Sequence, residues 1–465
     1  MKIVFVHYHL KSGGVSTVIK QQIDVLKPDC KVLVLTGEVP KNPFLADIIC
    51  IPGLSYDQIN QKLYDPKEVA QSMLRAISLR WKTGCDVMHV HNPTLAKNKS
   101  FLKILQLLKN QGIKFFLQIH DFAEDGRPGA FFHEQYISDS HYGTINSRDY
   151  NILLKAGLKQ NGLHKIPNIV NSFNNISTTK QNNYILYPIR AIRRKNIGEA
   201  ILLSIFFKNR DTLAITLPPN SPSDMDSYHA WKKFVTKNKL NVKFEVGLRN
   251  DFKSLVESSK YVITTSITEG FGFSFLEPWT AGKLVWGRKL PDICSDFEKH
   301  GIQLNHMYNQ LLVPVRWIGK ELIHEKLISC IKKCCALYNY DIDIRQWFKS
   351  LLQEDLIDFG LLSEAFQKQI ISSILVNKKV MKTLIHHNPF LLNPGTVPDS
   401  RKLIQNNHTR VLTNYNKEKY RKNLLAVYAS VKTYDVHHSI DKKMLLSEFF
   451  NPETFSLLKW EDYVQ

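Results

Sequence analysis

Residues 269–277 read Glu-Gly-Phe-Gly-Phe-Ser-Phe-Leu-Glu, which places two acidic residues eight positions apart around a glycine turn. The apolar run 261–266 before them indicates a buried strand, and the stretch itself indicates the start of a helix. In an open α/β sheet such a junction lies at the carboxyl edge, where ligands bind. Gly272 lets the backbone approach a ligand, and a helix start offers N–H groups to phosphate. Because Glu269 and Glu277 suit sugar and ribose hydroxyls, we predict a nucleotide-sugar pocket.

Short apolar runs alternate with helical patterns on both sides of this stretch. The alternation predicts βαβ units and parallel sheets. A polar segment, residues 171–183, separates two such series and indicates a linker. We therefore predict an α/β chain with two doubly wound domains, 1–175 and 181–330, facing a cleft. The predicted strands are residues 2–6, 31–35, 87–90, 115–119, 184–187, 212–217, 242–246, 261–264 and 284–286, and three helices are predicted at 16–26, 67–81 and 99–108.

The last part of the chain has a different pattern. After about residue 330 the strand signal fades, and residues 341–390 and 411–450 have helical patterns. A turn-rich segment, residues 388–398, divides them. We predict a helical extension over residues 331–465.

Composition limits the class of protein. The 465 residues carry a net charge of +20, spread along the chain, which favours anionic partners such as nucleotide diphosphates, membrane surfaces or nucleic acid. A generically basic surface is the alternative. No apolar run approaches the roughly 20 residues of a membrane span, and the N-terminus lacks a signal-peptide pattern. We expect a cytoplasmic protein, with the inner face of the membrane as a second location. The seven scattered cysteines fit buried thiols in a reducing compartment.

Two motifs follow predicted strands of the first half. Gly13 and Gly14 precede a predicted helix and would let main-chain N–H groups face a ligand. Taken alone, the pair is better explained as a tight strand-to-helix turn. The absence of Gly-x-Gly-x-x-Gly there argues against a dehydrogenase. His120 follows the 115–119 strand and could hydrogen-bond a substrate hydroxyl or simply pack. His89 and His91 should share one face of their strand, and we interpret them as packing residues in preference to a metal pair.

A basic motif opens the second half. Arg190-Ala-Ile-Arg-Arg-Lys195 follows the 184–187 strand. The arginine fork and the lysine point charge both suit phosphate oxygens, and cations near a diphosphate stabilise the charge that develops as it leaves. A solvated basic surface is the alternative. Asp224 and Asp226 lie in a Ser/Pro-rich segment, and we interpret them as solvated acids that bind no metal.

Residues 1–330 together resemble the retaining family 4 glycosyltransferases of the GT-B fold, which has two Rossmann-like domains. The family's Glu-x7-Glu motif is matched by Glu269 and Glu277, and its Arg-x4-Lys pair by Arg190 and Lys195. Weaker matches are the double glycine at 13–14, the His-Asp pair at 120–121 and Ile-Pro-Asn-Ile-Val at 166–170.

The resemblance implies a role for each matched residue. Arg190 and Lys195 would hold the donor diphosphate, Glu269 would contact the transferred sugar, and Glu277 would accept hydrogen bonds from the ribose hydroxyls. Backbone N–H groups would meet sugar hydroxyls and phosphate at Phe271, Gly272, Phe273 and Ser274.

The resemblance also implies the reaction. His120 would face the transferred sugar and the acceptor, and Gly13 and Gly14 would leave room for both. The donor would be a UDP- or GDP-sugar, with no metal and no other cofactor. Transfer would retain configuration by a front-face route, because no well-placed nucleophilic acid is evident. The last helix, within residues 441–460, would cross back to the first domain.

Three stretches depart from the family. Pro278 should kink or shorten the helix in which it lies. Arg288, after a Trp-Gly pair, is a candidate extra contact with phosphate or with an acceptor anion. Asp121, Glu124 and Arg127 lie in a polar, turn-rich stretch that could bind a polar acceptor.

Alternative functions stay open at this point. A glycan phosphorylase-like enzyme would use free phosphate in place of the nucleotide. A glycosyltransferase acting on a tRNA base would need a contiguous basic face. A binding protein without activity would not need the four residues of the two family motifs. The acceptor stays unknown among membrane glycan, small metabolite, protein and RNA.

Overall fold

The computed structural model describes residues 1–11, 13–40, 44, 46–59, 63–173, 181–208, 210–344, 347, 355–452 and 454–461. The chain divides into two compact units. Unit 1 comprises Met1–Ile169 and Tyr415–Phe449, and unit 2 comprises Val170–Asn414 and Phe450–Gln465. Parts of the predicted linker (174–180) and of the predicted helical region (345–346 and 348–354) lie outside the described residues.

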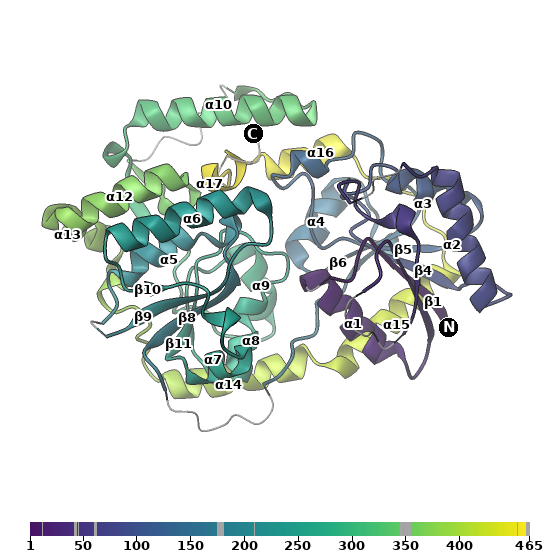
Figure 1. Ribbon diagram of the computed structural model, residues 1–465, viewed down its shortest axis with the longest axis horizontal. Helices are drawn as coiled ribbons and strands as arrows, with labels where there is room; N and C mark the ends of the chain where they lie inside the picture. Colours follow the sequence, from purple (N-terminus) through teal and green to yellow (C-terminus); the bar gives the residue numbers. More distant parts are fainter. Residues whose placement is uncertain are drawn as a thin grey trace. The chain divides into compact units, whose positions relative to one another are not determined.

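The described residues of unit 1 form a seven-stranded parallel sheet in the order β3-β2-β1-β4-β5-β6-β7. The order reverses between β1 and β4, which makes their carboxyl ends a topological switch point. Helices cover both faces of the sheet (Figure 1). The strands are β1 (Lys2–His7), β2 (Lys31–Thr36), β3 (Asp47–Cys50), β4 (Val87–His91), β5 (Phe115–Gln118), β6 (His141–Thr144) and β7 (Leu163–Lys165). The helices are α1 (Gly14–Leu26), α2 (Pro66–Arg80), α3 (Phe101–Asn110), α4 (Ser147–Lys155), α15 (Lys417–Thr433) and α16 (Lys442–Phe449).

The core of unit 1 joins the start of the chain to a late helix. Helix α1 buries Val18, Ile19 and Ile23, and α15 packs against it with Leu424 and Tyr428. These apolar side chains recur at helical spacing, and their burial supplies the driving force for docking. The segment 415–449 therefore belongs structurally to unit 1.

Unit 2 repeats the doubly wound pattern. Its described residues form a five-stranded parallel sheet in the order β10-β9-β8-β11-β12, with the switch point between β8 and β11. Figure 1 shows α5, α6 and α12 on one side of this sheet and α7, α8 and α14 on the other. The strands are β8 (Tyr184–Arg190), β9 (Thr212–Leu217), β10 (Val242–Lys243), β11 (Tyr261–Thr264) and β12 (Val285–Gly287). The helices are α5 (Ile197–Ser204), α6 (Pro222–Lys237), α7 (Phe252–Ser258), α8 (Glu277–Thr280), α9 (Pro291–Lys299), α10 (Lys320–Tyr338), α12 (Glu364–Val376), α13 (Lys378–His387), α14 (Ser400–Asn414) and α17 (Leu457–Trp460).

Beyond residue 330, the regular secondary structure of the described residues is helical apart from one short strand. Strand β14 (Leu356–Asp358) pairs antiparallel with β13 (Leu312–Pro314). A three-residue strand is too short to show the alternation by which strands are predicted. The prediction that residues 341–390 are helical is therefore wrong at β14.

The α/β fold with two parallel-sheet domains is confirmed. The 212–217 and 261–264 strands agree with β9 and β11 to the residue. Among the described residues, no helix combines the length and the apolar character needed to cross a bilayer.

Candidate functional site

The switch point of unit 2 brings together the two sequence motifs of that half. The loop at residues 190–196 begins at the last residue of β8 and is called the donor loop after the diphosphate-binding role predicted for it. The segment 265–269 follows the neighbouring strand β11. Lys195 forms an ion pair and hydrogen bond with Glu269. Parallel strands meet at one edge through their carboxyl ends, so residues 74 positions apart become partners.

Backbone hydrogen bonds hold the donor loop against the segment after β11. The N–H of Ile267 donates to the carbonyl of Arg194 at 3.0 Å. The hydroxyl of Thr265 donates to the carbonyls of Lys195 at 3.2 Å and of Asn196 at 2.9 Å. The loop thus has a defined backbone before any ligand binds, which is the condition for placing Lys195 accurately.

The ion pair between Lys195 and Glu269 is largely shielded from water. The exposed fractions of the two side chains are 15% and 9%. Burial raises the pKa of Glu269, but the charges of Lys195 and Arg194 and hydrogen bonds to the carboxylate outweigh it, so this pKa lies below its usual value. Glu269 is therefore ionised at neutral pH and serves as the counter-ion of Lys195.

The glycine turn adopts the conformation for which glycine is suited. Gly272 has a φ of +87°, and a Cβ there would lie 2.9 Å from the ring of Phe275. The following helix is much shorter than the sequence suggests: η6 (Phe273–Phe275) is one turn, and α8 spans four residues with Pro278 in its first turn. The predicted shortening at Pro278 is thus present. The Ser274 hydroxyl is buried without a hydrogen-bond partner among the described residues.

Glu277 differs from Glu269 in having no counter-ion. Its side chain is half-buried, and its carboxylate makes no hydrogen bond or ion pair with any described residue. Burial raises its pKa to about 7. The ionised form of a buried carboxyl without a protein partner is stabilised by hydrogen-bond donors that a ligand brings.

Two of the three arginines of the basic motif, Arg190 and Arg193, have different surroundings. Arg190 is half-buried, and its guanidinium makes no hydrogen bond or ion pair within the part of the chain described. Arg193 is buried, its N–H donates to Asp224 at 3.2 Å, and its guanidinium donates to the carbonyl of Ser223 at 2.9 Å. Asp224 is therefore not solvated as predicted: it is 3% exposed and holds the donor loop from the first turn of α6.

Arg288 lies in a buried ion cluster. Its guanidinium donates to Glu199 at 2.6 and 2.9 Å and to Asp358 at 2.7 Å through each of two nitrogens. A third acceptor is the carbonyl of Asn309 at 3.0 Å. The side chain is 4% exposed, and these partners occupy all its nitrogens. This placement makes Arg288 a structural residue, in place of the phosphate or acceptor contact suggested by its sequence position.

Unit 1 gathers histidines at the carboxyl edge of its sheet. His89 and His91 share one face of β4, as predicted, and their rings stack with centroids 4.3 Å apart. His120 Nε2 lies 2.9 Å from His91 Nδ1, so one of the two nitrogens donates. His7, at the end of β1, was not singled out from the sequence; its ring lies 6.2 Å from that of His91.

These histidines are neutral. Burial, followed by the neighbouring histidines, lowers the pKa of His7 to about 3, and burial lowers the pKa of His120 to about 4. His89 Nε2 donates to Gln118 at 2.9 Å, which leaves Nδ1 to accept from Tyr428 at 2.8 Å. His89 is thus saturated by packing partners. Within the described residues, no three His, Cys, Asp or Glu side chains are grouped as metal ligands.

The predicted acceptor residues of unit 1 are mostly engaged with each other. Asp121 accepts from Arg127 at 3.0 Å, and both are partly exposed. Glu124 is fully buried and accepts from the Tyr136 hydroxyl at 2.7 Å. Burial raises the pKa of Glu124. Its position is that of an interior residue.

The double glycine lies where the sequence places it, at the start of α1. Gly13 and Gly14 are both exposed. A Cβ on Gly14 would meet no atom within 4 Å, and one on Gly13 would meet only the Lys11 carbonyl, at 3.9 Å. No side chain caps α1, so its first N–H groups are available to a ligand.

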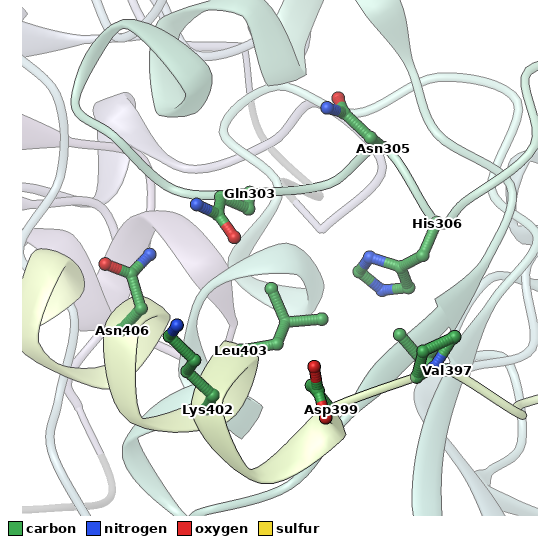
Figure 2. A pocket seen from close by; sticks show the side chains of 9 residues that line it. Gln303, Asn305, His306, Val397, Asp399, Lys402, Leu403 and Asn406 are labelled. Carbon is green, nitrogen blue, oxygen red and sulfur yellow. The ribbon is translucent and has the colours of Figure 1, made fainter.

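A separate pocket of about 530 Å³ lies in unit 2 between residues 303–306 and 397–406. Figure 2 shows the amides of Gln303 and Asn406, the His306 ring and Asp399 around it. None of the residues predicted for the donor site is among its lining residues. It is therefore distinct from the switch-point site.

Comparison with known proteins identifies a sequence relative of this chain. The chain is 26% identical over 405 residues to mannosylglucosyl-3-phosphoglycerate synthase of Petrotoga mobilis, covering 78% of this chain and 79% of the relative. No family model matches the chain.

Solved glycosyltransferase structures share the fold at low identity. HepE of Anabaena, solved with UDP-glucose, has a TM-score of 0.55 at 13% identity and covers 92% of this chain and 100% of its own. Sucrose-phosphate synthase of Thermosynechococcus elongatus has a TM-score of 0.52 at 13% identity, covering 92% and 98%. A glycosyltransferase of Rickettsia africae has a TM-score of 0.53 at 14% identity, covering 93% and 98%. The sequence relative and the GT-B fold together support a glycosyltransferase.

Proposed function

We propose that this chain transfers a hexose from a UDP- or GDP-sugar to an acceptor hydroxyl, with retention of configuration and without a metal ion. The observation that carries this proposal is the pairing of Lys195 with Glu269 at the switch point of unit 2. Glu277, eight positions further along the chain, lacks a partner among the described residues. A switch point is where open α/β sheets bind nucleotides. The sequence relative supports a sugar-transfer reaction.

The donor diphosphate is bound by cations of the donor loop. Lys195 reaches it as a point charge and Arg190 as a planar fork, and both stabilise the charge that develops on the departing diphosphate. Backbone N–H groups at 271–274 and the Ser274 hydroxyl, which lacks a partner in the described structure, contribute hydrogen bonds. Side-chain cations thereby supply the positive charge that a metal ion provides in other transferases.

A front-face route fits the chemistry of Glu269. This carboxylate is already engaged by Lys195, and its lowered pKa makes it a weak base. It is therefore suited to accept hydrogen bonds from the hydroxyls of the transferred sugar. The departing phosphate oxygen takes the acceptor's proton while the acceptor attacks from the same side. His120 is neutral and faces the transferred sugar and the acceptor in this proposal, while Gly13 and Gly14 leave room for donor and acceptor.

Two observations guide the choice of acceptors to test: the name of the sequence relative and the positive net charge of this chain. The relative's named product is a glycosylated phosphoglycerate, so acceptor trials begin with glycosides of phosphoglycerate. The net charge of +20 supports an anionic acceptor or surface, with anionic membrane or RNA as further trials. The proposal includes a cytoplasmic location, where nucleotide sugars are available.

Nucleotide binding tests the proposal directly. We expect one nucleoside diphosphate among UDP, GDP and ADP to raise the melting temperature selectively. Glu277→Gln should weaken its binding about 10- to 100-fold, because two charge-assisted hydrogen bonds to ribose hydroxyls are lost. Affinity for the wild type should rise between pH 6 and pH 8, since the Glu277 carboxyl, with a pKa of about 7, ionises over this range. Calorimetry over this pH range gives both results.

The variant also controls for titration of the nucleotide itself. In the Glu277→Gln variant, nucleotide affinity should lose the part of its pH dependence that comes from Glu277. The pH dependence that persists in this variant comes from titration of the nucleotide's phosphate. Glu257→Gln is the matched control, because Glu257 is a buried acid elsewhere in unit 2, on α7. Stabilisation by inorganic phosphate alone would favour the phosphorylase-like alternative. Salt-sensitive binding of RNA without nucleotide binding would favour the tRNA alternative.

Glu269→Gln should separate binding from catalysis. Removing the counter-ion of Lys195 leaves its charge for the diphosphate, so the nucleoside diphosphate should bind about three- to tenfold more tightly. Turnover should fall by about 100-fold or more, because the sugar loses a charged acceptor in the transition state. Calorimetry and initial rates measure the two effects. Weaker nucleotide binding with unchanged turnover would contradict the assignment of Glu269.

A further inference from the structure

The Arg288 cluster, defined as Glu199, Arg288, Asp358 and Tyr308, is connected to the donor loop. Glu199 lies in the first turn of α5, directly after the loop, and is fully buried. It accepts from Arg288 through both oxygens and from the Tyr308 hydroxyl at 2.8 Å. Arg288 and Tyr308, from different parts of the chain, therefore hold the start of α5 through Glu199.

Asn196 is the link between the cluster and Lys195. Its backbone is left-handed, with a φ of +51°, and its side-chain amide donates to Glu199 at 2.8 Å. Its amide oxygen accepts from Gln367 of α12 at 2.9 Å. The residue next to Lys195 is thus held from two sides by side chains, while its carbonyl accepts from Thr265.

Two glycines make the close approach possible. A Cβ on Gly360 would lie 2.5 Å from Arg288 Nη2, and one on Gly198 would lie 2.2 Å from the amide oxygen of Gln367. Both approaches are shorter than any side chain allows. Gly360 is therefore packed directly against Arg288, and Gln367 of α12 is packed directly against the first turn of α5.

We propose that Glu199, Arg288 and Asp358 are positioning residues that hold Lys195 in its phosphate-binding place through Asn196. The inference rests on the proposed function, because it assigns a task toward the donor. It also gives the region beyond residue 330 a role. Asp358 of β14 accepts from Arg288, and Gln367 of α12 donates to Asn196, so both support the donor loop.

A cluster of this kind costs more desolvation than apolar packing would, so stability alone is a poor reason for it. The hydrogen bonds of the cluster are directional, and they fix the orientation of the side chains that they join. The bidentate bonds from Arg288 to each of two carboxylates hold Glu199 in one orientation. Glu199 in turn orients Asn196. A displacement of about 1 Å at a catalytic group can cost about 100-fold in rate, which is the reason for such a brace.

Asn196→Gly tests the link with little disturbance of the backbone. Glycine adopts a φ of +51° without strain, so the change removes the two side-chain hydrogen bonds alone. We expect kcat to fall about tenfold or more and donor KM to rise, with acceptor KM unchanged. Amide hydrogen exchange at residues 193–199 in the ligand-free protein should become faster. Gln367→Met, which removes one of the two bonds, should have the same effects to a smaller degree.

Asn407→Leu is the matched control. Asn407 is another fully buried asparagine of unit 2, and it binds both backbone groups of Gln303 at 2.9 Å, away from the donor loop. This variant should lose stability while donor kinetics and exchange at 193–199 stay at wild-type values. If Asn196→Gly and Gln367→Met resemble this control while the wild type binds nucleotide, the positioning role is refuted and the proposed function stands. A wild type that binds no nucleotide would overturn both.

Discussion

Replacing Lys195 with alanine is expected to lower sugar transfer by about a thousandfold while the protein stays folded. The variant loses the cation that stabilises the departing diphosphate, and single preorganised charges or donors of this kind are worth about 100- to 1,000-fold in kcat. It also leaves Glu269 without its counter-ion at a site where the pair is largely shielded from water. The diphosphate would then meet an unpaired carboxylate, which lowers its affinity further. Initial rates and calorimetric nucleotide binding measure the two losses.

Lys289→Ala is the matched control for this experiment. Lys289 is exposed to the same degree, 16% against 15%, and is also ion-paired, to Glu298 at 2.9 Å. It lies in unit 2 outside the donor loop. Its loss should leave transfer within about twofold, because a partly exposed ion pair contributes little. Equal activities of folded Lys195→Ala and Lys289→Ala would remove the centre of the proposed mechanism.

The parts of this molecule that sequence predicts well are local or periodic. Strands such as β9 and β11 are continuous apolar runs, as expected for strands buried on both faces. The donor loop and the Glu-x7-Glu stretch each follow such a strand. Once the sheet is parallel, both must lie at its carboxyl edge. The pairing of Lys195 with Glu269 is a consequence of this topology and needs no further sequence signal.

The parts that the sequence does not predict depend on contacts between distant residues or on very short elements. Strands β3, β6 and β7 have three or four residues and show no usable periodicity. Arg288 looked like a free cation near the donor site, because its partners Glu199 and Asp358 are 89 and 70 positions away. Nothing local marks those acids as buried. The roles of Asn196 and Gln367 are hidden for the same reason.

Arg288→Met is expected to destabilise unit 2 by about 3–5 kcal/mol. Methionine fills similar space but leaves Glu199 and Asp358 buried without their counter-ion, and breaking a buried ion pair by removing one partner costs about this much. Burial already raises the pKa of Glu199, against the lowering effect of Arg288. Without Arg288 that pKa must rise further. Urea unfolding measures the lost free energy of unfolding from the transition that belongs to unit 2.

The pH dependence of the Arg288→Met variant distinguishes buried charge from lost packing. A carboxyl whose folded-state pKa lies above its unfolded value of about 4.3 holds more protons in the folded state, so stability falls as pH rises between the two values. The deficit of the variant should therefore be smaller at pH 5 than at pH 8. Adding Glu199→Gln and Asp358→Asn should recover much of it, while Arg316→Met, an exposed arginine of the same unit, should cost no more than about 0.5 kcal/mol. A deficit that is independent of pH and survives neutralisation of both acids would show that Arg288 serves as packing volume, and the brace of the donor loop would then not depend on its charge.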